Sequence, residues 1–228
     1  MEKIKPIIFA SDWWAKAAVY PDRHYPASAG IMLTDHLLAV YSLIDQIFEF
    51  DEQQFLQKIF HLLSFLGLDK DQVYYDLGVV ALLHDIGKTE DDKSQYVVHP
   101  LTKQIVINRH SVVGVRAAID ILELYPKLNN EQRQRIYWII EQHDISYGLF
   151  REFKKHGTVP NFTTWEIINN NIDTKPCAGI MYLLLFKLAD IHGHANIEDV
   201  IWFYNTVNAN YFYHYNIDLP IPQETDIR

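Results

Sequence analysis

Apolar residues recur at intervals of three and four through most of this chain, which is the spacing of helices with one buried face. The pattern predicts helices over residues 34–50, 51–67, 69–87, 110–126, 129–144, 176–193 and 197–213. No alternation of strands with helices indicates a parallel sheet. Because 49% of the 228 residues are apolar, these helices have enough material for a sizeable common core. The predicted fold class is therefore all-α.

One segment departs from the helical pattern. Residues 95–109 contain two short β-branched runs around a proline-containing turn, which predicts a small β-hairpin. Residues 1–33 are interrupted by proline and glycine, and we expect an irregular segment that packs on the core. Residues 34–195 are expected to form the helical core. Residues 196–228 add a C-terminal helix and tail to the same domain, because no linker precedes them.

Charge and cysteine content narrow the class of protein. Twenty Lys and Arg against 29 Asp and Glu give a formal net charge of −9, which disfavours binding along duplex nucleic acid. The single cysteine, Cys177, excludes an internal disulfide. No apolar run is long enough for a membrane span or a secretory signal, so we expect a cytoplasmic protein without a membrane partner. The 14 Tyr and 12 Phe suit a dimer interface or the core equally well.

Several histidines and aspartates lie on the apolar faces of their predicted helices. Residues three, four and seven apart share a helix face, and this test points His36, His84, His143 and Asp190 inward. His110 lies just before a helix start, and Asp85 is turned about 100° round the helix from His84. For any one of them alone, an ordinary hydrogen bond in the core is the simpler interpretation. Six buried polar groups would each need a partner, whereas a metal centre satisfies them together. Imidazole and carboxylate suit Mn, Fe, Co, Ni or Zn, with Mg also possible, as one or two divalent ions.

The order of these residues resembles a known signature. His36, His84-Asp85 and Asp190 are similar to the H…HD…D pattern of the HD superfamily, and "LLHDIGK" (82–88) closely matches its central motif. "RHSVVGVRAA" (109–118) resembles the H-x-x-x-G-x-x-A segment of several branches, and "IIEQHD" (139–144) resembles the helix that supplies a further histidine. The resemblance covers residues 34–195 and implies a helical core around a metal.

The resemblance implies a ligand set. One metal would take His36, His84, Asp85 and Asp190. A second would take His110 and His143, with Asp85 bridging the two, as in the binuclear branches. The chain departs from the cyclic-dinucleotide phosphodiesterases of the superfamily, because it has no G-Y-P tripeptide and Asp144 follows His143 where those enzymes have His-Glu.

Charge arithmetic favours an anionic substrate. Two divalent ions and two carboxylates leave about +2 at the site, which attracts phosphate inside an acidic protein. We expect Lys88 to contact phosphate or stabilise transition-state charge, unless it is a solvated lysine at a helix end. Lys187 would bind Asp190 or substrate, and Arg109 and His194 are further candidate substrate contacts. Asp144 would act as a general acid, orient His143 as an outer partner, or cap its helix.

These features predict an enzyme. The first hypothesis is a metal-dependent phosphohydrolase that acts on a nucleotide or another small phosphate ester through metal-activated water. The second is a di-iron oxygenase resembling myo-inositol oxygenase, in which the same ligand order occurs. The third is a nucleotide-binding sensor without catalysis. The hairpin predicted at 95–109 would serve as a lid or substrate wall, or as a plain surface hairpin.

Overall fold

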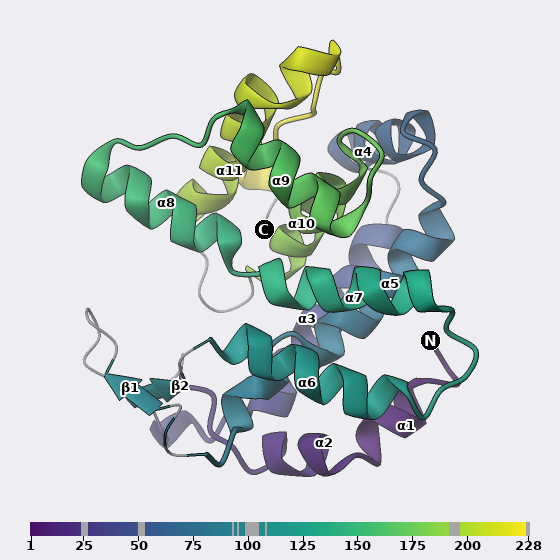
Figure 1. The fold of residues 1–228 in the computed structure, drawn as a ribbon, viewed down its shortest axis with the longest axis vertical. Helices are drawn as coiled ribbons and strands as arrows, with labels where there is room; N and C mark the ends of the chain where they lie inside the picture. Colours follow the sequence, from purple (N-terminus) through teal and green to yellow (C-terminus); the bar gives the residue numbers. More distant parts are fainter. Residues whose placement is uncertain are drawn as a thin grey trace.

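The structure is a computed structural model that describes residues 1–23, 27–49, 53–92, 94, 96–98, 105–107, 109–191 and 197–226. Its helices are, in chain order, α1 (Lys5–Phe9), α2 (Asp12–Ala17), α3 (Leu33–Glu49), α4 (Gln54–Phe65), α5 (Lys70–Leu83), α6 (His110–Leu122), α7 (Asn130–Gln142), α8 (Ile145–His156), α9 (Phe162–Ile172), α10 (Ala178–Ala189) and α11 (Ile197–Asn210). The arrangement is shown in Figure 1. The all-α prediction is confirmed, and each helix predicted from periodicity is present with ends shifted by a few residues.

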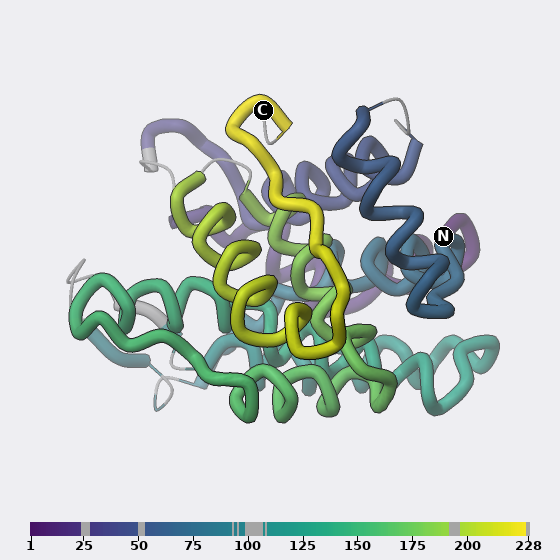
Figure 2. Tube along the Cα trace, turned by 90° about the horizontal axis from the view of Figure 1, so that it is seen from above, coloured from purple at the N-terminus to yellow at the C-terminus, as the bar shows by residue number. Residues whose placement is uncertain are grey.

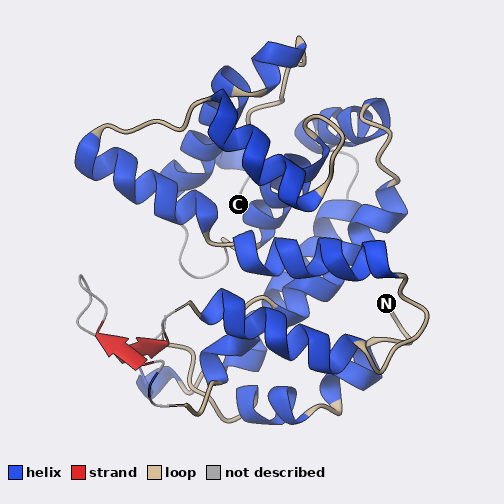
Figure 3. Ribbon diagram, in the orientation of Figure 1, coloured by secondary structure: helices blue, strands red, loops and turns tan. Residues whose placement is uncertain are grey.

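The only strands among the described residues are β1 (Tyr96–Val98) and β2 (Ile105–Ile107), which pair antiparallel with Val97 opposite Val106. Figure 3 shows them at the margin of the helical body. They lie in the segment for which a hairpin is predicted. The Tyr96 hydroxyl donates to the carbonyl of Glu90 at 2.9 Å, which ties β1 to the turn after α5. The hairpin is therefore beside the segment that carries Lys88.

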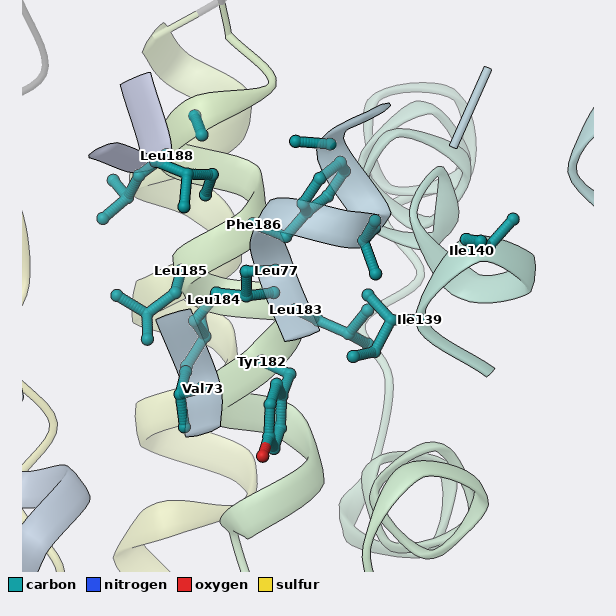
Figure 4. Close-up of a cluster of buried hydrophobic side chains, with 14 of the residues drawn as sticks. Val73, Leu77, Ile139, Ile140, Tyr182, Leu183, Leu184, Leu185, Phe186 and Leu188 are labelled. Carbon is teal, nitrogen blue, oxygen red and sulfur yellow. The ribbon is translucent and has the colours of Figure 1, made fainter. Parts of the chain in front are cut away.

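Helix α10 lies at the centre of the core. Nearly all of its side chains are buried, as its apolar sequence requires, and it contacts α3, α5, α7, α9 and α11. Figure 4 shows Val73 and Leu77 of α5 and Ile139 of α7 clustered with the leucines of α10. Burial of such residues is the main favourable contribution to folding. The same core holds together the three helices that carry His84, His143 and Asp190.

Both ends of the described chain pack on this core. Residues 1–33 contain the short helices α1 and α2, where the sequence suggests irregular chain, and Ile4, Ile8 and Ala17 are buried in the common core. At the other end, Figure 2 shows the C-terminal segment running back alongside α11. Leu219 is buried there, and its N–H donates to the side chain of Asn208 at 3.2 Å. Among the described residues, every helix is too short or too polar to cross a lipid bilayer.

Candidate metal centre

Six polar side chains from five helices meet at one place in the interior. His84, His143 and Asp190 each follow directly on the last residue of a helix, namely α5, α7 and α10. His110 is the first residue of α6, and His36 lies in the first turn of α3. His36, His84, Asp85 and His143 are buried, whereas His110 and Asp190 are partly exposed. These are the six residues that the family resemblance implies as metal ligands.

The first four ligand candidates form one group around the end of α5. His36 Nε2 and His84 Nε2 lie 3.3 Å apart. Asp85 Oδ2 lies 3.5 Å from each of these nitrogens, and Asp190 Oδ1 lies 3.2 Å from His84 Nε2 and 3.6 Å from His36 Nε2. Donors bound to one ion at about 2.0–2.2 Å lie roughly 3.0–3.6 Å from one another. The spacing of His36, His84 and Asp85 therefore fits a single bound ion, and Asp190 lies at ligand spacing from both imidazoles.

A second group lies on the other side of Asp85. Asp85 Oδ1 is 3.1 Å from His110 Nε2 and 3.5 Å from His143 Nε2, and the two nitrogens are 3.4 Å apart. Asp85 thus directs one oxygen to each group, as a bridging carboxylate does. None of the described residues gives the buried Oδ1 atom a hydrogen bond of acceptable geometry. A cation between these atoms would satisfy it. His36, His84 and Asp85 of the first group, and Asp85, His110 and His143 of the second, meet the distance requirement for holding a metal ion.

Asp85 reaches both groups because the α5 helix ends before it. A continuous helix would turn Asp85 about 100° away from His84. Instead α5 stops at Leu83, Asp85 takes φ −103° and ψ 0°, and a short 3-10 turn, η2 (Ile86–Thr89), follows. Both side chains then face the same centre. Gly87 lets α6 pack closely against this turn, since a Cβ there would lie 2.1 Å from the carbonyl oxygen of His110.

Two backbone hydrogen bonds orient the histidine rings. His84 Nδ1 lies 3.1 Å from the carbonyl oxygen of Ala81, and His143 Nδ1 lies 2.7 Å from that of Ile140. A carbonyl only accepts, so each Nδ1 carries a proton and Nε2 is the atom left to bind a metal. Although burial lowers the pKa of His143, Asp144 and Asp85 raise it to about 9, so this ring must lose its Nε2 proton when a metal binds. Loss of that proton leaves Nδ1 alone protonated. This is the tautomer that a metal ligand bound through Nε2 requires. The edge of the Phe186 ring packs against both imidazoles, with centroid distances of 5.1 and 6.3 Å.

The charges of the centre follow from burial and proximity. Burial raises the pKa of the Asp85 carboxyl, but the nearby Lys88 ammonium lowers it more, so its pKa lies well below the usual range. Burial lowers the pKa of His84 more than the nearby carboxylates raise it, which favours neutral imidazole. Asp85 is therefore ionised and His84 neutral near pH 7, which are the states that bind metals.

Lys88 is the cation at the centre. Its Nζ lies 2.5 Å from Asp85 Oδ2, and its side chain is 23% exposed. Burial lowers the pKa of the ammonium, but Asp85 raises it more, so Lys88 is charged. The alternative of a fully solvated lysine at a helix end does not describe this position. Lys88 lies between the ligands and solvent, where an approaching anion would meet it.

Asp144 lies close to the ligand nitrogens of the second group. Its Oδ2 is 3.2 Å from His110 Nε2 and its Oδ1 is 3.7 Å from His143 Nε2. It is not the outer partner of His143, because the Nδ1 atom of that ring is bonded to Ile140. It also makes no side-chain cap to α8, which begins after it. Its side chain is 53% exposed, so it borders the open side of the second group.

The remaining predicted substrate contacts are placed differently. Lys187 forms a 2.8 Å ion pair with the buried carboxylate of Asp199 on α11 instead of binding Asp190. Arg109 is exposed and precedes α6 with φ 53°. His194 lies outside the described residues, as does the tip of the hairpin at 99–104. Phe186 was not singled out for the site, although it lies one turn before Asp190 on the same face of α10.

Metal binding is expected to stabilise the chain. With free manganese at ~100 times its dissociation constant, the free energy of unfolding should rise by about 2.7 kcal/mol, because only the folded chain assembles the ligands. For a chain of this length the melting temperature rises by roughly 5–11 °C. Thermal unfolding with manganese, with calcium and with a chelator measures this. Calcium, which prefers oxygen ligands, should give a much smaller shift, and equal curves in all three conditions would contradict a metal centre.

Comparisons with protein-family models, curated proteins and solved structures find no match to this chain. The support for a metal site is therefore the arrangement of the side chains themselves. That geometry is a buried cluster of histidine and aspartate in a helical fold, able to hold a metal ion and compatible with an HD-type site.

Proposed function

We propose that this chain is a metal-dependent phosphohydrolase of the HD type that acts on a nucleotide or another small phosphate ester. The observation that carries the proposal is the position of Lys88, a charged and partly exposed ammonium 2.5 Å from the carboxylate shared by the two ligand groups. Two divalent ions carry +4, and the carboxylates of Asp85, Asp144 and Asp190 carry −3, which leaves a charge of +1 at the site. The Lys88 ammonium raises this charge to +2. Such a site attracts phosphate within a chain of net charge −9.

The ligands divide between the two proposed ions. His36, His84 and Asp190 would hold one ion, His110 and His143 the other, and Asp85 would bridge them. Such ions, when bound, lower the pKa of water and neutralise phosphate charge. The chain itself supplies the cation that meets the substrate. The Lys88 ammonium is positioned to donate hydrogen bonds to phosphoryl oxygens, which are more negative in the transition state than in the substrate.

Asp144 is an ionised carboxylate beside the second ligand group. Partial burial raises the pKa of its carboxyl, but the imidazoles of His143 and His110 lower it more, so it stays ionised. An ionised carboxylate accepts the proton of the attacking water first, so the general-acid role considered from the sequence belongs to the later step, in which Asp144 gives that proton up. Hydrolysis then forms a bond from water oxygen to phosphorus and breaks the ester bond. The proton held on Asp144 is available to the leaving oxygen, which balances the reaction.

The first test is phosphate release from a panel of nucleotides and sugar phosphates in oxygen-free buffer with manganese. An Asp85→Ala variant serves as the blank. Turnover by the wild type that is absent from the variant supports the phosphohydrolase. A silent panel, combined with oxygen consumption by iron-loaded protein with a polyol or phosphonate, would replace it with the di-iron oxygenase. Tight nucleotide binding without turnover by metal-loaded protein would instead identify a sensor.

Lys88→Met is expected to reduce kcat on the order of 10²–10³-fold while the bound metal is retained. The substitution keeps the length of the side chain but removes the charge that the transition state needs. Lys88→Arg keeps the charge and should retain part of the activity. Steady-state kinetics and metal analysis of both variants measure this. Unchanged kcat in Lys88→Met would assign Lys88 a role in pairing Asp85 only.

A further inference from the structure

A second buried polar cluster lies further back along the helices that lead to the metal centre. It takes no part in the proposed hydrolysis. Asp76 of α5 is fully buried, and its Oδ2 accepts a hydrogen bond from Arg135 Nε of α7 at 2.6 Å. Its Oδ1 accepts from Gln72 at 2.7 Å and from Gln132 at 3.4 Å. The Arg135 guanidinium in turn lies 5.5 Å from the ring centroid of Tyr182 on α10. This Asp76–Arg135–Tyr182 cluster therefore joins three helices.

Each of the three residues in this cluster precedes a proposed metal ligand by the same number of residues along its helix. Eight residues separate Asp76 from His84 on α5, Arg135 from His143 on α7, and Tyr182 from Asp190 on α10. Eight residues of helix rise ~12 Å. The three helices therefore run in the same direction, touching at one level through this cluster and ~12 Å further on through their ligand residues. Figure 1 shows α5, α7 and α10 together in the body of the molecule, and Figure 4 shows Tyr182 in their common core.

Equal spacing means that the cluster sets the axial position of each helix against the others. His84, His143 and Asp190 all lie at helix ends, so a helix displaced along its axis would move its ligand by the full displacement. The contacts between the two levels come from aliphatic residues such as Leu77, Ile139 and Leu183. Contacts of this kind tolerate small shifts, because apolar packing is not directional. The charge-assisted hydrogen bond between Asp76 and Arg135 is directional and short, and so specifies one position of α5 against α7. The stacking of the Arg135 guanidinium on the Tyr182 ring extends this contact to α10.

We propose that Asp76, Arg135 and Tyr182 are positioning residues that hold α5, α7 and α10 in the register at which His84, His143 and Asp190 meet. This inference rests on the proposed metal centre. It concerns geometry and not stability, since replacing a buried ion pair by apolar residues of similar volume is often neutral or stabilising. The two effects can therefore be separated by experiment.

The test compares the wild type with a double variant, Asp76→Leu with Arg135→Met, in which the pair is replaced by apolar side chains. Manganese binding is measured by calorimetry on protein stripped with a chelator, together with the melting temperature and the spin-coupled signal of a manganese pair. The double variant should melt at the same temperature or higher. It should nevertheless bind manganese on the order of ten-fold more weakly, as expected when support of metal ligands is lost, and lose the spin-coupled signal.

Two further variants act as controls. Arg133→Met removes another arginine from α7, whose guanidinium binds the carbonyl of Tyr125 and not α5, and it should bind manganese like the wild type. Arg135→Lys keeps a cation beside Asp76 and should recover most of the affinity. If the double variant folds and binds manganese with wild-type affinity and signal, the positioning role is wrong while the metal centre stands. If the wild type itself binds no manganese, the proposed metal centre is wrong and the inference with it.

Discussion

Replacing Asp85 with alanine is expected to abolish metal binding in both ligand groups and to reduce phosphate release on the order of 10³-fold or more. Its Oδ2 lies 3.5 Å from the Nε2 atoms of His36 and His84, and its Oδ1 lies 3.1 Å from that of His110. Each group therefore loses an oxygen ligand. Each also loses one of the two carboxylates that would balance the charge of its metal ion. The Lys88 ammonium also loses its partner. Metal analysis after dialysis and steady-state hydrolysis measure the two losses.

The matched control is Asp71→Asn, an exposed aspartate in the first turn of the same helix, which should leave metal content and turnover unchanged. Asp85→Asn is the graded variant. It keeps one oxygen but cannot bridge as an anion, so we expect one ion to remain bound weakly. Two tightly bound ions in Asp85→Ala would contradict the bridging position and would require the two groups to act as separate sites.

The faces of the ligand helices were predictable because a helix repeats every 3.6 residues. His36, His84 and His143 share stripes with aliphatic neighbours, so burial of the stripe carries the imidazoles inward. The direction of Asp85 was not predictable from the same rule. It depends on the end of α5 at Leu83 and on the turn that follows, which packs against α6 through Gly87 in a tertiary contact.

The partners of charged residues were also beyond local sequence. Lys187 lies three residues before Asp190, yet its ammonium binds Asp199 on a different helix. Asp144 follows His143 directly, yet its oxygens lie near the ligand nitrogens of two rings. In both cases the partner is selected by how distant helices pack. Periodicity within one helix carries no information about that choice.

The N-terminal helices were not predictable either, because they too depend on packing against distant parts of the chain. Helices α1 and α2 have five and six residues, which is too short to be stable alone in water. Local signals exist, since α1 has proline in its first turn and Ser11 accepts from the N–H of Trp14 at the start of α2. What stabilises these helices is burial of Ile4, Ile8 and Ala17 against the core. Sequence patterns of this length cannot show that burial.

Gly87→Ala is expected to destabilise the chain by about 3 kcal/mol, at the upper end of the usual cost of overpacking, and to disturb the metal centre. A Cβ at this position would lie 2.1 Å from the carbonyl oxygen of His110 and 2.4 Å from the backbone nitrogen of Gly114. Both atoms belong to the backbone of α6, so no side chain can move aside. The start of α6 must shift and carry the His110 imidazole away from Asp85. The melting temperature should fall by roughly 6–12 °C.

The control for this substitution is Gly148→Ala in α8, where a new Cβ meets no atom within 4 Å. Alanine there should raise the free energy of unfolding by about 0.5–1 kcal/mol, because glycine is the poorer helix former. Opposite signs for one substitution at two glycines separate the steric effect from helix propensity. Because the shift affects His110 and not His36, Gly87→Ala should weaken the second manganese ion more than the first. A variant with wild-type stability and two tightly bound ions would show that α6 does not approach the turn after α5 this closely.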